Sequence, residues 1–424
     1  MEHSKRNLVI IGGGFAGLEV AKRVDKRRWN VRIIDRNNYH SFAPLFYQVA
    51  SSALEPASVT FPLRREVRRH NVRGCYFDMG TVTGIDVVNK VVHTDSEDVA
   101  YDDVVIAAGT VNNFFGMEGL DRRVYTLKSV GEAIRCRNAI LGSLERAAVC
   151  RNEAERRALL TFVVVGGGPA GVEIAGALGE MKRYVIKRDY PRISPDEVRV
   201  VLCEGGDRVL AAMSEQSSVD ARRDLEHLLV EVRTGARMQS YDGRTMAFAD
   251  GSTIESEVVI WTAGVVGASI PLVGTDVKQG RGGRFEVDEY NQVIGVDNVY
   301  AIGDICRHVD EEYPAGCPQM ARPAIEQGKR LAKNLNDPLR RRPFRYRSRG
   351  VMATIGRNSA VVDIGSLHFG GWFAWITWMG VHLMSLLGMR NKAVVMLNWI
   401  WSYWGYSTSL RLLLRPERLP DEKK

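Results

Sequence analysis

The chain has 424 residues, and at roughly 150 residues per domain this length predicts two or three domains. Apolar residues make up 45% of the chain and charged residues 25%, with 41 Gly against 14 Pro, which excludes collagen-like and wholly disordered chains. The formal net charge of +8 permits a nucleic acid or an anionic lipid surface as a partner without deciding between them.

The first predicted element is a buried parallel strand that runs into a glycine-rich turn and a helix. The apolar strand over 8–11 precedes the G-x-G-x-x-G motif of Gly12, Gly14 and Gly17. Glycine is needed there for a tight turn, for close approach of the backbone to a pyrophosphate, and for contact between helix and strand. The helix N-terminus would add N–H donors and a positive dipole. The run is too short for the apolar part of a signal peptide, so we expect a cytoplasmic location.

An acid at the end of the next strand strengthens the motif. The strand over 31–34 ends in Asp35, where a carboxylate accepts hydrogen bonds from a ribose diol. The unit then recurs: residues 162–175 match residues 8–21 at 8 of 14 positions, 154 residues later, and a second acid, Glu204, ends a later strand. One motif alone also fits a tight turn without a ligand. Two motifs with both acids predict two dinucleotide sites, for a tightly held flavin and a transient nicotinamide.

Three later strands end in small residues, over 104–109, 258–264 and 299–304. The last ends in Gly303 and Asp304, where this architecture aims a carboxylate at the ribityl chain of a flavin. Together with the segment over 34–50 and the run over 261–265, these motifs make the sequence resemble the type II NADH dehydrogenases. The resemblance covers nearly the whole chain.

The resemblance implies FAD on the first motif and NADH on the second. The FAD-binding residues it implies are Gly12, Gly14, Phe15, Ala16, Gly17, Asp35, Arg36, Ala108, Gly109, Gly303 and Asp304. The NADH-binding residues it implies are Gly166, Gly168, Gly171, Glu173, Glu204, Ala263 and Gly264. The carboxylate of Glu204 also favours NADH over NADPH because it repels a 2′-phosphate. We expect no metal site.

The six cysteines separate competing flavoprotein chemistries. None forms a C-x-x-C or C-x4-C pair, which excludes the dithiol chemistry of thioredoxin and glutathione reductases. Sulfide:quinone oxidoreductases use widely separated cysteines, so Cys150, Cys306 and Cys317 leave that alternative open. Cys306 is most simply interpreted as a small buried apolar residue.

Three residues are the predicted catalytic group. Glu173 matches a position that the family places near flavin and acceptor, where a carboxylate relays a proton; a helix-dipole role is the alternative. The family's quinone-site signature A-Q-x-A-x-Q is altered here, because Arg322 and Glu326 replace the two glutamines. Their spacing of four predicts an ion pair on one helix face. Either the quinone site has changed polarity, or the two residues only pair at a helix end.

The C-terminal region differs in composition. Six arginines fall within 340–349, and residues 336–424 hold 14 Lys and Arg against 5 Asp and Glu, a net +9, which leaves −1 for the rest. The stretches 364–389 and 393–410 contain no charged residue and hold six of the eight Trp. We expect amphipathic helices in the plane of one leaflet, separated by residues 390–392, with His382 at a polar edge. A buried dimer interface is the alternative, and no nucleic-acid-binding signature accompanies the arginines.

The predicted fold is α/β, with two Rossmann-like domains and a C-terminal amphipathic membrane-attachment segment. We expect an FAD domain over 1–115 and 282–336, an NADH domain over 116–281, and a membrane-association or dimerisation region over 337–424. The resemblance implies a non-electrogenic NADH:quinone oxidoreductase that passes hydride to flavin N5 and two electrons to a membrane quinone. The protein would be a homodimer, peripheral on the cytoplasmic face and bound to anionic lipid. A soluble-acceptor flavin oxidoreductase and a flavin-binding regulatory protein are the remaining alternatives.

Overall fold

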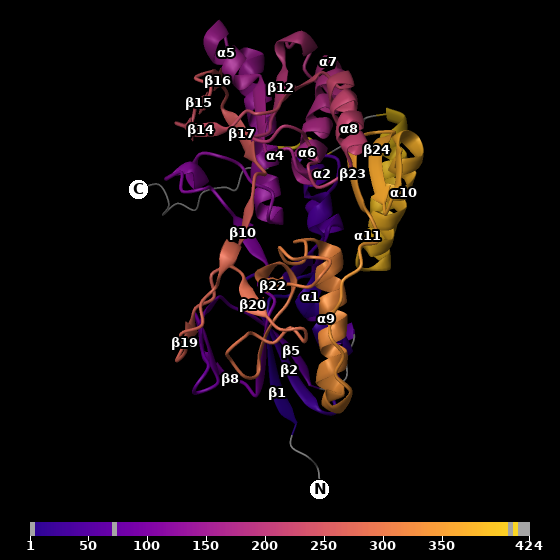
Figure 1. Cartoon of the computed structure of the whole chain (residues 1–424). Helices are drawn as coiled ribbons and strands as arrows, with labels where there is room; N and C mark the ends of the chain where they lie inside the picture. The colour runs from indigo at the N-terminus through magenta and orange to yellow at the C-terminus, as the bar shows by residue number, and fades with distance from the viewer. Residues whose placement is uncertain (1–4, 70–73, 406–409, 414–424) are drawn as a thin grey trace, which may run out of the picture. The chain divides into compact units, whose positions relative to one another are not determined.

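The computed structural model describes residues 5–69, 74–405 and 410–413. The chain forms two compact units, each with one of the two glycine motifs (Figure 1). Unit 1 comprises Met1–Ser41, Thr60–Val111 and Val265–Arg347, and unit 2 comprises Phe42–Val59, Asn112–Gly264 and Ser348–Lys424. These two units are defined by how closely the residues pack. The predicted domains are defined by which cofactor they bind, so their boundaries stay a prediction.

Unit 1 is built on a five-stranded parallel sheet in the order β21-β9-β1-β2-β5. Its strands are β1 (Arg6–Ile11), β2 (Trp29–Asp35), β5 (Cys75–Met79), β9 (Asp103–Ile106) and β21 (Val299–Ala301). The end of β1 and all of β9 are buried, as expected for parallel strands covered on both faces. Because all five strands run the same way, their carboxyl ends meet at one edge of the sheet.

The helices of unit 1 are α1 (Phe15–Arg23), α3 (Leu63–Arg69) and α9 (Ala321–Asn336). Helix α9 packs closely on α1, because a Cβ at Gly328 would lie 2.5 Å from the carbonyl oxygen of Ala16. The antiparallel and edge strands of the unit are β3 (Tyr39–Ser41), β4 (Thr60–Pro62), β6 (Val82–Asp86), β7 (Val91–Thr94), β8 (Asp98–Ala100), β18 (Val265–Gly267), β19 (Leu272–Val273), β20 (Phe285–Val287) and β22 (Cys306–His308). Strand β10 (Thr110–Asn112) lies where the chain passes from unit 1 to unit 2.

Unit 2 repeats this plan with a four-stranded parallel sheet in the order β13-β12-β11-β17. The strands are β11 (Thr161–Val165), β12 (Arg199–Cys203), β13 (Val230–Arg233) and β17 (Val258–Trp261), and a small antiparallel sheet adds β14 (Met238–Tyr241), β15 (Thr245–Phe248) and β16 (Thr253–Glu255). β11, α6 and β12 in unit 2 correspond to β1, α1 and β2 in unit 1. The predicted α/β fold with two Rossmann-like domains is therefore confirmed.

The helices of unit 2 are α2 (Phe46–Ala50), α4 (Val130–Val149), α5 (Glu153–Leu159), α6 (Pro169–Glu180), α7 (Ile186–Asp189) and α8 (Glu215–His227). Side-chain caps fix several starts; the Ser129 hydroxyl, for example, accepts the backbone N–H of Glu132 at 3.2 Å, which satisfies an otherwise unpaired donor. Helix α6 does not end regularly. A π-helical turn over Met181–Val185 joins it to α7.

The C-terminal part of unit 2 is an antiparallel sheet followed by two helices. Strands β23 (Val351–Gly356), β24 (Ser359–Ile364) and β25 (Leu367–Gly370) precede α10 (Gly371–Ser385) and α11 (Met389–Gly405). A Cβ at Gly176 would lie 2.5 Å from the carbonyl oxygen of Ile355, so β23 lies directly against α6 (Figure 1). β24 and β25 face α8.

Two details of the C-terminal prediction are corrected. Residues 390–392 do not separate the two helices, because the break falls at 386–388 and α11 already begins at Met389. The uncharged stretch from residue 364 also includes strand β25, because its first residues pair with β24 before the helix starts. Among the described residues, no helix combines the length and the apolarity needed to cross a bilayer.

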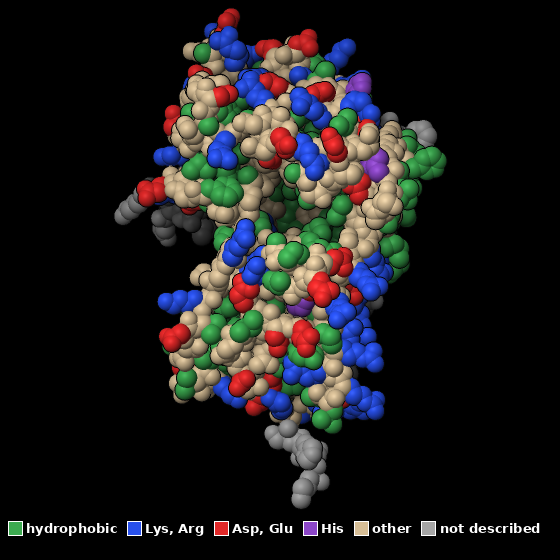
Figure 2. All heavy atoms as spheres, in the orientation of Figure 1, with side chains coloured by type: hydrophobic (Ala, Val, Ile, Leu, Met, Phe, Trp, Pro, Cys, Tyr) green, Lys and Arg blue, Asp and Glu red, His purple; other side chains and the backbone are tan. Residues whose placement is uncertain are grey.

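Helices α10 and α11 leave many large apolar side chains in solvent. The most exposed, between 60% and 74%, are Phe373, Met384, Met389, Leu397 and Trp401. Figure 2 shows hydrophobic side chains along the right-hand edge, where these helices lie. A patch of this kind marks an interaction surface.

Candidate functional site

The first glycine motif forms a cradle whose glycines have separate tasks. Gly12 has φ of +103°, and a Cβ there would lie 2.4 Å from the carbonyl oxygen of Ala107. A Cβ at Gly17 would lie 2.0 Å from the carbonyl oxygen of Gly12. A Cβ at Gly14 meets nothing within 4 Å. Gly12 and Gly17 are therefore required by the fold, whereas Gly14 leaves open space over the N-terminus of α1, as a bound pyrophosphate needs.

Asp35 holds the turn of this cradle. Its carboxylate accepts the backbone N–H of Gly13 at 2.7 Å and that of Asn37 at 2.7 Å. Burial raises the pKa of Asp35 even though these hydrogen bonds oppose the shift. Nδ1 of the buried His40 lies 3.0 Å from the carbonyl oxygen of Gly13, and the Phe15 ring packs edge-on against His40. The carboxylate oxygens retain lone pairs for a ribose diol.

The other predicted FAD residues follow neighbouring strands of the same sheet. Ala108 and Gly109 come after β9, and Gly303 comes after β21, so all reach the edge where β1 and β2 end. Ala16 is buried in α1, and Arg36 and Asp304 are respectively exposed and half-buried. The structure thus gathers the predicted FAD set around one sheet edge; the roles of its members stay predictions.

Sequence reasoning missed one residue of this edge. The side chain of Gln327, in α9, accepts the backbone N–H of Gly303 at 2.6 Å and donates to Sγ of Cys306 at 3.1 Å. It is 1% exposed and fixes the turn that carries Asp304. Its position directly after Glu326, the last residue of the altered signature, was the signal available.

The second motif repeats the geometry of the first. A Cβ at Gly166, where φ is +111°, would lie 2.7 Å from the backbone nitrogen of Ala263, and one at Gly171 would lie 1.8 Å from the carbonyl oxygen of Gly166. A Cβ at Gly168 again meets nothing within 4 Å. Gly264, after β17, lies at the same edge as Ala263. A second open cradle therefore lies over the N-terminus of α6.

Glu204 occupies the place that Asp35 has in unit 1. Its carboxylate accepts the backbone N–H groups of Gly167 and Gly206, the latter at 2.7 Å. The nearby Arg208 donates to the carbonyl oxygens of Ala211 and Met213 at 2.8 Å and 3.1 Å. These hydrogen bonds hold the guanidinium against the loop over 211–213.

Glu173 lies in the second turn of α6 and is 8% exposed. Burial raises its pKa to about 8, with the backbone N–H of Thr354 and the side chain of Trp378 acting in the opposite direction. A carboxyl with this pKa takes up and releases a proton near neutral pH. The helix-dipole explanation is weaker in this environment, because a group that is mostly neutral complements the dipole poorly.

The predicted pair of Arg322 and Glu326 forms at the start of α9. The guanidinium lies 3.1 Å from the Glu326 carboxylate, which also lies 3.7 Å from Nζ of Lys329. Both side chains of the pair are partly in solvent, so the ion pair is a weak one. Arg322 and Glu326 belong to unit 1 and Glu173 to unit 2, and a shared catalytic role stays a prediction.

The cysteines lack the properties of a redox pair. All six are free thiols. Burial raises the pKa values of Cys306 and Cys317 to about 12, which keeps both as thiols. This favours the interpretation of Cys306 as a buried apolar residue.

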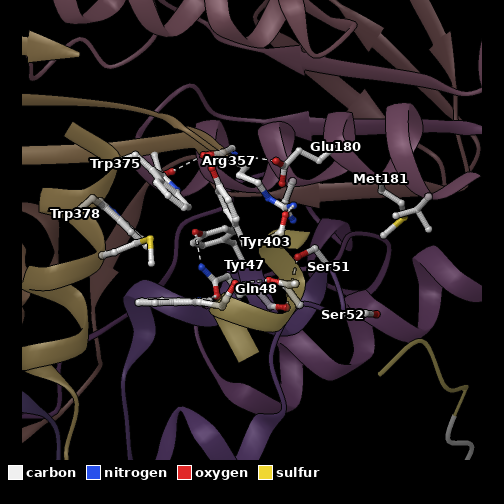
Figure 3. Close-up of a pocket in the computed structure, with 18 of the residues that line it drawn as sticks. Tyr47, Gln48, Ser51, Ser52, Glu180, Met181, Arg357, Trp375, Trp378 and Tyr403 are labelled. Carbon is white, nitrogen blue, oxygen red and sulfur yellow. Dashed lines mark hydrogen bonds between the residues drawn. The ribbon is translucent and has the colours of Figure 1, made fainter. Parts of the chain in front are cut away.

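A pocket that the sequence did not predict lies within unit 2. It has a volume of about 130 Å³, and aromatic side chains surround it (Figure 3). Gln48 joins two of them, because its amide donates to the hydroxyl of Tyr47 at 2.8 Å and accepts from Nε1 of Trp399 at 2.8 Å. Glu180, at the end of α6, also lines it. The signal in the sequence was the spacing of seven between Glu173 and Glu180, which places both on one helix face.

Comparison with known proteins identifies the family. The model of pyridine nucleotide-disulphide oxidoreductases matches residues 6–328, and that of the NDH2 C-terminal domain matches residues 348–404. The type II NADH:quinone oxidoreductase NdhA of Mycobacterium tuberculosis is 34% identical over 423 residues, which cover 95% of this chain and 88% of that protein. The chain belongs to the type II NADH:quinone oxidoreductase family.

Solved structures agree with this membership at the level of the fold. The structure of NDH2 from Plasmodium falciparum in complex with NADH superposes with a TM-score of 0.89 at 20% identity, covering 97% of this chain and all of that one. The sulfide:quinone oxidoreductase of Aquifex aeolicus gives a TM-score of 0.72 at 17% identity, over 94% of this chain and 95% of that one. The predicted family and the predicted class of oxidoreductase are confirmed.

Proposed function

We propose that this protein oxidises NADH and reduces a membrane quinone, with FAD bound in unit 1 and NADH in unit 2. The observation that carries the proposal is the pair of open dinucleotide cradles, each with its acid, in a chain of this family. Bound FAD would supply a carrier that takes two electrons from a hydride donor and returns them to a quinone. The chain supplies binding and orientation, through the turns at Gly14 and Gly168 and through Asp35 and Glu204.

The proposal assigns the three parts of the chain as the sequence predicted. Residues 1–115 and 282–336 would form the FAD domain, residues 116–281 the NADH domain, and residues 337–424 the region for membrane association or dimerisation. The exposed apolar side chains of α10 and α11 support docking on one leaflet, with anionic lipid attracted by the net +9 of residues 336–424. We propose a peripheral location on the cytoplasmic face, as a homodimer. No transport of charge across the bilayer is involved.

Rapid-mixing absorbance measurements test the function. Anaerobic NADH should bleach the flavin of the purified protein, and a menaquinone or ubiquinone analogue should restore its colour rapidly. Purified protein without flavin, or reduced flavin that quinones leave unchanged, would refute the proposal. In a matched experiment Glu204→Ala should weaken NADH binding by roughly tenfold or more, since a hydrogen bond to a charged group contributes about 1.5–3 kcal/mol.

One observation favours a second acceptor. The signature glutamines are replaced by Arg322 and Glu326, whose ion pair makes this helix start more polar than two amides would. A soluble or biosynthetic acceptor is therefore the second candidate. Replacing both residues with Gln separates the two, because faster quinone reduction in this variant would identify quinone as a secondary substrate.

A further inference from the structure

The pocket in unit 2 is lined by polar residues as well as by aromatic ones. The polar residues among those that line it include Glu180, Gln48 and Tyr47. Its volume of about 130 Å³ has room for several water molecules, since one needs roughly 10–15 Å³ and polar partners. Figure 3 shows Tyr47 and Gln48 lying between the tryptophan side and the Glu180 side of the pocket. The pocket therefore suits ordered water.

Two carboxyl groups, the buried Glu173 and the half-buried Glu180, share this part of α6. Glu173 and Glu180 are seven residues apart, which puts them on one helix face with about 10 Å of rise between them. Burial, followed by the charge of Glu173 and later that of Glu180, raises the pKa of Tyr47, so both carboxyls act on this phenol. The amide of Gln48 donates to the Tyr47 hydroxyl at 2.8 Å and so fixes its place in the pocket.

Trp378 connects Glu173 to the pocket. Its side chain is 1% exposed and lines the pocket. A hydrogen bond from this side chain to Glu173 lowers the pKa of that carboxyl. Glu173 is therefore reached from the pocket wall through Trp378.

The proposed reaction needs a proton from solvent. In NADH + H⁺ + quinone → NAD⁺ + quinol, hydride transfer supplies two electrons and one proton, and the second proton comes from water. We propose that this pocket is a water-filled proton reservoir and that Glu180 holds the proton that reaches Glu173 through it. This inference rests on the proposed function. Glu180 releases its proton toward Glu173 by way of pocket water and the Tyr47 hydroxyl, and solvent then reprotonates it.

The groups around Glu180 stabilise both of its charge states. Its carboxylate accepts the backbone N–H of Arg357 at 2.7 Å. Burial raises the pKa of Glu180, and this hydrogen bond and the Arg357 charge oppose the rise. The Arg357 guanidinium donates to the carbonyl oxygen of Tyr403 at 2.7 Å, and Arg411 lines the same pocket. A carboxyl balanced in this way can exchange its proton with water.

Two acceptors separate proton delivery from electron transfer. Ferricyanide takes electrons without protons, whereas quinone takes both, so both steady-state rates are measured for the full-length protein in lipid between about pH 6 and pH 9. Glu180→Gln should lower the quinone rate by about tenfold at the alkaline end, and less at the acidic end where protons are abundant. Its ferricyanide rate should stay within about twofold of the wild-type rate. Glu180→Asp should restore most of the quinone rate.

Two further variants provide a second test of the proton path and a control. Tyr47→Phe removes only the hydroxyl and should show the same alkaline loss with quinone, which keeps the test valid if Glu180→Gln fails to fold. Glu226→Gln neutralises an exposed carboxyl that pairs with Arg222 on α8 and should change neither rate. Equal losses with both acceptors, or an unchanged quinone rate in both Glu180→Gln and Tyr47→Phe, would overturn the inference. A wild-type protein unable to reduce quinone would instead refute the proposed function.

Discussion

The glycines of the two motifs differ in what a methyl group would meet, and this makes them separable by mutation. Gly14→Ala places a Cβ in open space and Gly17→Ala places one 2.0 Å from a backbone oxygen. We expect Gly14→Ala to fold with a nearly unchanged melting temperature but with much weaker FAD retention. Gly17→Ala should be destabilised by more than about 2 kcal/mol.

The flavin content and thermal melting of the two variants check this prediction. Gly168→Ala and Gly171→Ala form the matched pair in unit 2, with NADH affinity as the readout. Equal loss of stability in Gly14→Ala and Gly17→Ala would contradict the open space at Gly14, and unchanged FAD retention in Gly14→Ala would show that this space is not a ligand site.

The raised pKa of Glu173 predicts that the stability of the protein depends on pH. Its pKa is raised from 4.5 to about 8, so the folded state holds a proton that the unfolded state has lost, and stability falls as pH rises through this window. Glu173→Gln removes the titration and should stabilise the protein on the order of a few kcal/mol near pH 9. Near pH 4, where the wild-type side chain is protonated in both states, the variant should melt close to the wild type.

Melting curves recorded across the window provide the measurement. The quinone reductase activity of the wild type should also decline above about pH 8, and the Gln variant should lose that decline along with most of its rate. A constant difference in melting temperature at every pH would contradict a raised pKa.

The residues predicted from sequence were those that backbone geometry dictates. Gly12, Gly17 and their counterparts are readable because only glycine fits the turn, and Asp35 is readable because it ends the next strand. The sequence carries a signal for the positions of Gln327 and Glu180 but not for their roles, because these depend on neighbours distant in sequence: Gly303 for Gln327 and Arg357 for Glu180.

At the scale of elements, helix α8 is joined to the C-terminal sheet by a hydrogen-bond network that includes His368. His368 in β25 lies 3.0 Å from Asp220 of α8 through Nε2 and 3.1 Å from Asp363 of β24 through Nδ1. The hydroxyl of Ser217 donates to Asp363 at 2.8 Å. Burial acts to raise the pKa values of both aspartates, but the hydrogen bonds they accept outweigh it and lower both.

His368→Ala should loosen this junction. Two carboxylates would then lack a shared donor, so we expect a loss of about 1–3 kcal/mol and faster hydrogen exchange over 359–370. His93→Ala is the control: His93 lies 2.8 Å from Asp98 but that pair is largely in solvent, and its loss should cost less than about 1 kcal/mol. Equal effects of both substitutions would contradict a specific role of His368.

The same junction predicts a loss on acidification. Because the pKa values of Asp220 and Asp363 lie below their ordinary 3.8, their stabilising contribution is complete above that value and disappears as the pH falls through the lowered values. Protease cleavage within 359–370 should therefore rise sharply only below about pH 4. Cleavage that already rises near pH 6 would contradict this assignment.

Elements with a strong local pattern were predicted correctly, and those set by packing were not. The strands and helices of both motifs follow from apolar runs and glycines. The sequence missed the break at 386–388 because Gly388 is one of several glycines in that stretch, whereas Arg390, Asn391 and Lys392 fit into the first turn of α11. The strand β25 was missed because all of its pairing partner, β24, except Ile364 lies outside the uncharged stretch.

At the scale of the whole molecule, charge and apolar surface are concentrated in the last quarter of the chain. Phe344 and Tyr346 are 3% exposed, and the arginines that alternate with them, Arg345, Arg347 and Arg349, are exposed. The alternation turns the arginines outward along one extended segment. The alternation of arginines and aromatic residues is visible in the sequence. The burial of the two aromatic rings against Cys317 is visible only in the structure.

Replacing Arg345, Arg347 and Arg349 with Ser should weaken binding to vesicles that contain phosphatidylglycerol by tenfold or more, since each basic residue contributes about 1 kcal/mol near an anionic surface. Binding to phosphatidylcholine vesicles should be unchanged, and high salt should reduce but not abolish wild-type binding. Sedimentation with vesicles measures both. Unchanged binding to the anionic vesicles would assign the arginines another task.

The π-helical turn over Met181–Val185 has a consequence for chain length. Such a turn holds one residue more than an α-helix needs, so deleting one residue there would restore a regular helix and rotate everything after it by about 100°. Met181 and Val185 line the pocket in unit 2, whereas Gly168 lies a full helix away. Relatives that lack this pocket should therefore be one residue shorter at this point, and otherwise keep the same nucleotide-binding turn.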